Sequence, residues 1–284
     1  MPAHRNAFNL KTDVAQCLYN SSTSLNLPDT SKPLRMKSLN LFDVPIALGK
    51  YDYFINEIID LSYRPSGSYV CLLNVHMIIE AHRKPAFKNI LKAADLVLPD
   101  GKPITWALKI LNNVKQDRVA GMDIVPDLFR ELEKKGESVF FFGGTAAMLE
   151  ETKNFVSKKY PKLIIGGYHA PPFRELTKQE NEENINRLNS SGATIIFTVL
   201  GCPKQEIWMS SMKDKVNGVM IGIGGALPVL IGEKKRAPVW MQKNGLEWLF
   251  RLMQEPRRLM RRYTVTNAWF LFLLLKGYIE KKIS

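Results

Sequence analysis

Short apolar segments alternate with amphipathic helical segments along most of this chain. An apolar segment at residues 69–73 comes before helical segments at 77–82 and 86–93. Strands that alternate with helices favour a mostly parallel sheet with helices on both faces. The other expected strands of this pattern lie at residues 96–98, 138–142, 163–165, 194–200 and 218–223. The sequence therefore predicts an α/β fold built on a Rossmann-like sheet.

Helical periodicity and changes in composition predict how the rest of the chain is organised. A short strand is expected at residues 39–42. Further helices are expected at residues 51–62, 104–111, 124–134, 146–158, 179–189 and 206–213. The predicted regions are a loosely ordered extension at 1–35, an α/β body at 36–232 and a basic helical appendage at 233–284.

Positive charge is concentrated near the C-terminus. The net charge of the chain is +13, and the segment from Lys234 onward holds twelve Lys/Arg against three Asp/Glu. Such an excess favours an anionic partner, which could be a phospholipid surface, a phosphorylated ligand or nucleic acid. No nucleic-acid recognition module is evident, so we expect no nucleic-acid partner. The arginines that alternate with large apolar residues here are Arg251, Arg257, Arg258, Arg261 and Arg262.

This pattern suits an amphipathic segment that binds a membrane surface, or a docked helix pair with solvated charges. The longest late apolar run, residues 268–275, is far shorter than the roughly 20 residues that cross a bilayer. Cys17, Cys71 and Cys202 have no regular spacing, which favours a reducing compartment. We therefore expect a cytoplasmic protein bound peripherally to the inner face of the plasma membrane.

Polar residues follow two of the predicted strands. Asp100 ends one strand and is followed by Gly101, and residues 201–206 follow another. Ligands of open α/β sheets bind at the carboxyl ends of strands, so these positions predict a site. Asp100 is either a helix cap or turn residue, or a general base. Asn74 is either the N-cap of the next helix or a substrate ligand.

Glycines at two further strand ends could bring backbone N–H groups close to a phosphate. They include Gly143 and Gly224, although glycine at such turns is also common for steric reasons alone. The phosphate-binding pattern G-x-x-x-x-G-K-[ST] is absent, as are an Asp-x-Asp pair and any His/Cys cluster with metal spacing. We therefore expect neither a metal site nor a cofactor.

Together these motifs resemble the WecG/TagA/CpsF glycosyltransferases (glycosyltransferase family 26), which act in bacterial surface-polysaccharide synthesis. The resemblance runs from about Leu41 to Tyr263 and includes Asn74. Its other motifs are ADLVLPDG (94–101), DRVAG (117–121), PPFR (171–174), LGCPKQE (200–206), KRAP (235–238), GLEWLFRL (245–252) and EPRR (255–258).

The resemblance implies transfer of a hexose or N-acetylhexosamine, such as N-acetylmannosamine, from a UDP-sugar. The acceptor would be an undecaprenyl-pyrophosphate-linked saccharide, and the reaction would invert the anomeric carbon without a metal. Asp100 would be the base, with Lys204, Gln205 and Glu206 near the nucleotide sugar. The tail arginines would face lipid head groups or the acceptor's pyrophosphate, and the chain could self-associate.

Arginine suits a metal-free site because its planar guanidinium binds phosphate oxygens in pairs. We therefore expect Arg118 and Arg236 to stabilise the leaving UDP. The chain has Leu227-Pro228 where the family usually has Phe-Asp, which could alter recognition of the nucleotide. The alternative function is a non-catalytic, membrane-associated scaffold of polysaccharide assembly, in which Pro228 marks a decayed donor site.

Overall fold

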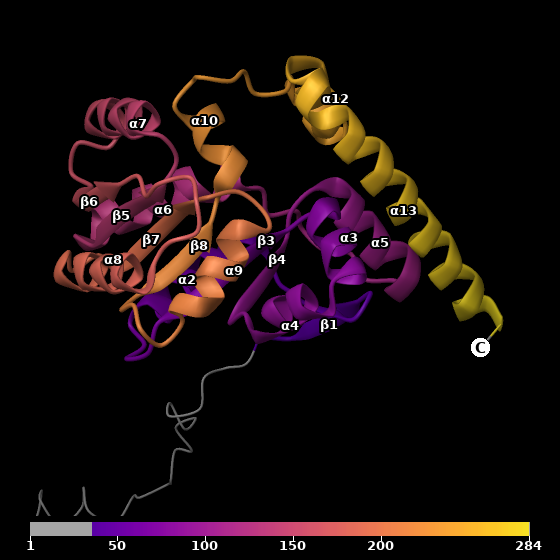
Figure 1. The fold of residues 1–284 in the computed structure, drawn as a ribbon. Coiled ribbons are helices and arrows are strands. Elements are labelled where there is room, and N and C mark those ends of the chain that lie inside the picture. The colour runs from indigo at the N-terminus through magenta and orange to yellow at the C-terminus, as the bar shows by residue number, and fades with distance from the viewer. Residues whose placement is uncertain (1–35, 284) are drawn as a thin grey trace, which may run out of the picture. The chain divides into compact units, whose positions relative to one another are not determined.

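The computed structural model describes residues 36–283, which belong to one compact unit (Figure 1). The predicted loose extension at residues 1–35 lies outside the described residues. The proposed boundary between a body and an appendage near residue 232 stays a prediction.

A six-stranded sheet forms the centre of this unit. Its order is β4-β3-β8-β7-β5-β6, and every neighbouring pair is parallel. These strands are β3 (Ser68–Leu73), β4 (Leu96–Pro99), β5 (Ser138–Gly143), β6 (Ile164–His169), β7 (Ile195–Val199) and β8 (Val219–Gly222). Every residue of β3, β4, β7 and β8 is buried, as expected for parallel strands covered on both sides. The predicted fold class is confirmed.

Helices cover both faces of the sheet and form two apolar cores. One core packs α2 (Tyr51–Ser62), α6 (Gly121–Lys135), α7 (Ala146–Lys159) and α10 (Leu227–Leu230) against the sheet. The other core includes side chains of α3 (Val75–Arg83), α4 (Pro85–Ala93), α5 (Lys102–Asn112), α8 (Lys178–Ser190) and α9 (Lys204–Met212). A short 3-10 helix, η1 (Gly224–Ala226), precedes α10.

The N-terminal part of the described chain contains a hairpin that the sequence analysis missed in part. The strand expected at residues 39–42 is β1 (Ser38–Leu41), and it pairs in antiparallel fashion with β2 (Val44–Ala47). The turn between them uses Phe42 and Asp43, which both have positive φ. Such two-residue turns usually carry Asn-Gly or Asp-Gly, and Phe-Asp is no local signal for a turn of this kind.

The C-terminal segment is helical, as predicted, and part of it is built into the core. It contains α11 (Val239–Lys243), α12 (Glu247–Gln254) and the 28-residue α13 (Pro256–Ile283). Phe270 and Leu273 of α13 are buried in the second core, and α13 lies against α3 and α5 (Figure 1). No helix in the described part of the chain combines the length and the apolar character needed to cross a membrane.

Gly143 should be intolerant of any side chain. Its φ is +106°, and a Cβ there would lie 2.7 Å from the carbonyl carbon and oxygen of Val199. Backbone strain and overpacking together should make Gly143→Ala about 3 kcal/mol less stable in urea unfolding. Gly192→Ala is the matched control, because Gly192 also has positive φ (+63°) but no atom lies within 4 Å of its Cβ position. It should cost only about 1 kcal/mol, and equal losses at both positions would contradict the clash.

Candidate active site

The carboxyl ends of the parallel strands bring the predicted site residues to one edge of the sheet. Asn74 follows β3, Asp100 follows β4, and Gly143 is the last residue of β5. Residues 201–206 follow β7, and Gly224 lies just after β8. The parallel strand order β4-β3-β8-β7-β5 places these turns along one edge, and those after β4, β3 and β8 are neighbours. The sequence-based expectation of a polar edge agrees with this arrangement.

The backbone around Asp100 is held by hydrogen bonds to neighbouring segments. Its N–H donates to the carbonyl of Leu73 at 2.8 Å, and the N–H of Val119 donates to the carbonyl of Pro99 at 2.8 Å. The N-cap of α5 is Gly101, with φ +91°, and no side chain caps this helix. Among the described residues the half-buried carboxyl of Asp100 makes no hydrogen bond or ion pair, so it does not act as a cap.

Burial and neighbouring charges set the protonation of Asp100. Burial is the main cause that raises the pKa of Asp100 to about 7. The charges of Glu247 and Asp123 raise this pKa further, whereas the guanidinium groups of Arg251 and Arg118 lower it. A carboxyl group with a pKa near neutrality can accept a proton more readily than an ordinary aspartate, which suits a general base.

Arginines and carboxylates form a network beside Asp100. Arg118, whose side chain is 13% exposed, donates to Asp123 at 2.8 Å and to Glu247 at the start of α12. Arg236 donates to the other oxygen of Asp123. Arg118 and Arg236, which were selected from the sequence, therefore share Asp123 as a hydrogen-bond acceptor. A phosphate could replace these carboxylates with similar geometry.

Arg251 is the tail arginine that reaches this edge. Its guanidinium donates to the carbonyl of Gly225, after β8, at 3.2 Å. No contact in the described part of the chain joins the other four tail arginines to Asp100. Arg258 pairs with Glu255 and Arg262 is half-buried, while Arg257 and Arg261 are exposed.

Asn74 does cap a helix, as one of its two interpretations predicted. Its side-chain oxygen accepts a hydrogen bond from the N–H of Met77 at 3.2 Å, in the first turn of α3. No hydrogen bond from its side-chain NH₂ is present among the described residues. The capping role and a ligand role are therefore compatible, because each uses a different atom of the amide.

The three consecutive residues Lys204, Gln205 and Glu206 lie in different surroundings. Lys204 is exposed, whereas Gln205 is 6% exposed and Glu206 is fully buried. Gln205 accepts from the N–H of Gly201 at 3.2 Å and donates to Glu206 at 2.7 Å. Burial is the main cause that raises the pKa of Glu206. The side chains of Gln205 and Glu206 thus pack inside the protein, where Gln205 holds the backbone of the loop after β7.

Close packing against Gln205 explains two glycines at the end of β8 and the start of η1. A Cβ at Gly222 would lie 2.7 Å from the side-chain nitrogen of Gln205, and one at Gly224 would lie 2.9 Å from its oxygen. A larger residue at either position would displace this amide. These glycines therefore allow the close packing of this segment against Gln205.

Asp123 and Glu247 are site residues that the sequence analysis did not select. Glu247 lies within the GLEWLFRL motif, and Asp123 lies in the first turn of α6, but neither has a local pattern that marks a role. Nothing in the part of the chain from residue 36 to 283 groups three or more His, Cys, Asp or Glu residues in a way that could hold a metal ion.

A family model and curated relatives match this chain. The family model described as the glycosyl transferase WecG/TagA/CpsF family matches residues 39–284. A Bacillus spizizenii protein is 28% identical over 200 residues, which covers 70% of this chain and 76% of that protein. A Bacillus subtilis protein is 28% identical over 232 residues, covering 81% and 87%. Both are named N-acetylglucosaminyldiphosphoundecaprenol N-acetyl-beta-D-mannosaminyltransferase.

Replacing Glu247 with glutamine should lower the pKa of Asp100 below about 7. The substitution removes a negative charge that raises this pKa, and it leaves the Arg118 charge, which lowers it, less neutralised. Titration of the Asp100 carboxyl by ¹³C NMR measures the shift. Glu233→Gln, at an exposed position that is not among the charges that shift this pKa, should leave the titration unchanged. An unchanged pKa in Glu247→Gln would show that the two carboxylates are not coupled.

Proposed function

The chain belongs to the WecG/TagA/CpsF family of glycosyl transferases, and from this premise we propose that it moves an N-acetylhexosamine from a UDP-sugar to a polyprenyl-diphosphate-linked saccharide. The names of the two Bacillus relatives support N-acetylmannosamine as the sugar and an N-acetylglucosaminyl lipid diphosphate as the acceptor. The observation that carries the proposal is the unpaired carboxyl of Asp100, with a pKa of about 7, near the guanidinium groups of Arg118 and Arg251.

We propose a single displacement that inverts the anomeric carbon. The acceptor hydroxyl oxygen attacks this carbon while its proton passes to the carboxylate of Asp100. The bond from the anomeric carbon to the diphosphate oxygen breaks, and UDP leaves with the bonding electron pair. One carboxylate on the acceptor side is sufficient for this chemistry, because the leaving diphosphate needs no proton.

Stabilisation of the leaving UDP falls to cationic side chains in this proposal, without a metal. Arg118, Arg236 and Arg251 lie at the edge that also carries Asp100. A diphosphate would take the place of Asp123 and Glu247 as the partner of Arg118 and Arg236. Backbone N–H groups at the glycine turns after β5 and β8 could add further donors.

The departure at Leu227-Pro228 does not by itself favour the scaffold alternative. Both residues are buried, and Pro228 lies in the first turn of α10, where proline fits because it removes no helical hydrogen bond. The segment is therefore well packed. If the protein fails to bind UDP, that result would favour the alternative function, a scaffold without a working donor site.

Asp100→Asn should lower turnover by roughly 10²- to 10⁴-fold while UDP still binds. The assay measures UDP release from UDP-N-acetylmannosamine with a short-chain N-acetylglucosaminyl lipid diphosphate, in the presence of EDTA. Because the raised pKa of Asp100 means that its charge destabilises the folded state above pH 7, the variant should be at least as heat-stable as the parent protein at pH 8. Asp214→Asn, at an exposed position, is the control. Near-normal turnover in Asp100→Asn would rule out the base.

We further propose that α11–α13 bind the anionic inner face of the plasma membrane, where the lipid acceptor is found. Arg257, Arg261 and Lys276 provide positive charge next to an apolar surface that is otherwise exposed to water. The exposed apolar side chains of these helices are Val239, Trp240, Trp248, Met253, Met260, Trp269, Leu271, Phe272, Leu275, Tyr278, Ile279 and Ile283.

The double substitution Leu271→Ser and Leu275→Ser should weaken sedimentation with anionic vesicles at least tenfold. Both side chains are more than half exposed, so their loss should leave the fold intact. Ile164→Ser, at a similarly exposed position on β6, is the matched control and should bind normally. If the double variant sediments normally, or if it changes only self-association in the absence of vesicles, this surface does not bind the bilayer.

A further inference from the structure

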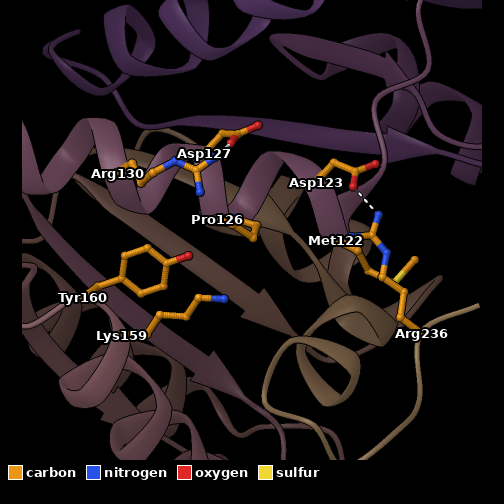
Figure 2. Close-up of a pocket in the computed structure, with 8 residues that line it drawn as sticks. All are labelled: Met122, Asp123, Pro126, Asp127, Arg130, Lys159, Tyr160 and Arg236. Carbon is orange, nitrogen blue, oxygen red and sulfur yellow. Dashed lines mark hydrogen bonds and ion pairs between the residues drawn. The ribbon is translucent and has the colours of Figure 1, made fainter. Parts of the chain in front are cut away.

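A cavity of about 290 Å³ lies along α6, beside the network that contains Arg118. This volume is close to the lower end of the range for ligand pockets. Figure 2 shows that α6 supplies one wall, the end of α7 another, and the segment before α11 a third. Its lining residues are Met122, Asp123, Pro126, Asp127, Arg130, Lys159, Tyr160 and Arg236.

The two carboxylates in this cavity are already fully used. Asp123 accepts from Arg118 through one oxygen and from Arg236 through the other. Asp127 accepts from Arg130 through one oxygen and from the hydroxyl of Tyr51, at 2.7 Å, through the other. Each carboxylate oxygen therefore has a donor, and neither residue is available to neutralise a further cation.

Lys159 is a cation of the cavity that has no carboxylate partner. Its ammonium lies over the rings of Phe155 and Tyr160, 5.4 and 6.0 Å from their centroids. No acidic side chain of the described residues pairs with it. The lining thus holds three cations against two anions, and the surplus positive charge lies at the Lys159 end.

The hydroxyl of Tyr160 lacks an acceptor for its proton. The residue is 4% exposed, and its hydroxyl has no hydrogen-bond partner of good geometry in the described part of the chain. In Figure 2 this hydroxyl points into the space between Arg130 and Lys159. Arg130 can donate a hydrogen bond to this hydroxyl, but a guanidinium group accepts none, so the proton of Tyr160 has no acceptor. A buried hydroxyl proton without an acceptor is costly, which indicates that an acceptor belongs in this space.

We propose that this cavity binds a phosphate group, with the Tyr160 hydroxyl donating to a phosphate oxygen and Lys159 and Arg130 supplying positive charge. A phosphate fits because it offers several acceptor oxygens to one hydroxyl donor and two cations that already converge. The group could belong to the donor nucleotide, to the lipid diphosphate or to free phosphate.

The cavity is separate from Asp100 yet connected to its surroundings. Asp123 and Arg236 line the cavity, and Asp123 also holds Arg118 beside Asp100. A phosphate in the cavity would lie at the far side of this network from the proposed base. The proposal does not depend on the glycosyl transfer, because binding of phosphate can be measured without turnover.

The test is a titration of the protein with inorganic phosphate, pyrophosphate, UDP and a short-chain lipid diphosphate at constant ionic strength. The ¹³C-methyl NMR signal of Met122, which lines the cavity, reports binding there. We expect a saturable shift of this signal with at least one of these ligands, and the ligand that binds tightest identifies the source of the phosphate. No saturable shift with any of them would overturn the proposal.

Two variants and a control locate the site. Tyr160→Phe keeps the ring, which contacts Phe129 at 5.1 Å between centroids, and should weaken binding about tenfold by removing one donor to a charged group. Lys159→Gln should weaken it about threefold. Lys158→Gln, at the exposed neighbouring position outside the cavity, should bind like the parent protein. Binding that is unchanged in both Tyr160→Phe and Lys159→Gln would place the phosphate elsewhere. The same titrations with Asp100→Asn distinguish a failure of the phosphate proposal from a failure of the proposed reaction. Loss of the proposed base should leave phosphate binding in the cavity unchanged.

Discussion

The parallel pairing of β3 with both β4 and β8 is the constraint on which the candidate site depends. Because the strands run in the same direction, every turn that follows one of them lies at the same edge of the sheet. Asp100 and the loop of Gly224 come from segments that are more than 100 residues apart in the chain, yet they share this edge. The strand order therefore brings the candidate site residues together. The side chains of the strands themselves pack into the two cores.

Charge neutralisation is the second requirement at this edge. Guanidinium and carboxylate groups that leave water need partners, and here Arg118, Asp123 and Glu247 provide them for each other. The same pairing keeps the arginines in a fixed orientation before any ligand arrives. Asp100 differs from its neighbours because it has no such partner, and burial is the main cause that raises its pKa.

Much of the fold could be predicted from the sequence, because the period of the apolar residues directly reflects burial in strands and helices. The helix at residues 51–62 was predicted with its observed bounds, and Asp100 could be selected from its place after a strand. The hairpin strand β2 and the roles of Asp123 and Glu247 could not. The pair Arg118–Glu247 joins positions 129 residues apart, and no local pattern encodes such a contact.

The packing of α13 on α3 affects how the protein would be oriented on a membrane surface. Phe270 and Leu273 join this helix to the same core as α3, whose first turn is capped by Asn74 at the site edge. A helix packed in this way cannot move independently of the sheet, so in the proposed membrane-bound state its angle to the bilayer would also set the direction that the candidate site faces. A site joined to its membrane anchor by a flexible linker would sample many orientations relative to the bilayer. Here a single orientation of the site would be set as soon as α13 binds the membrane.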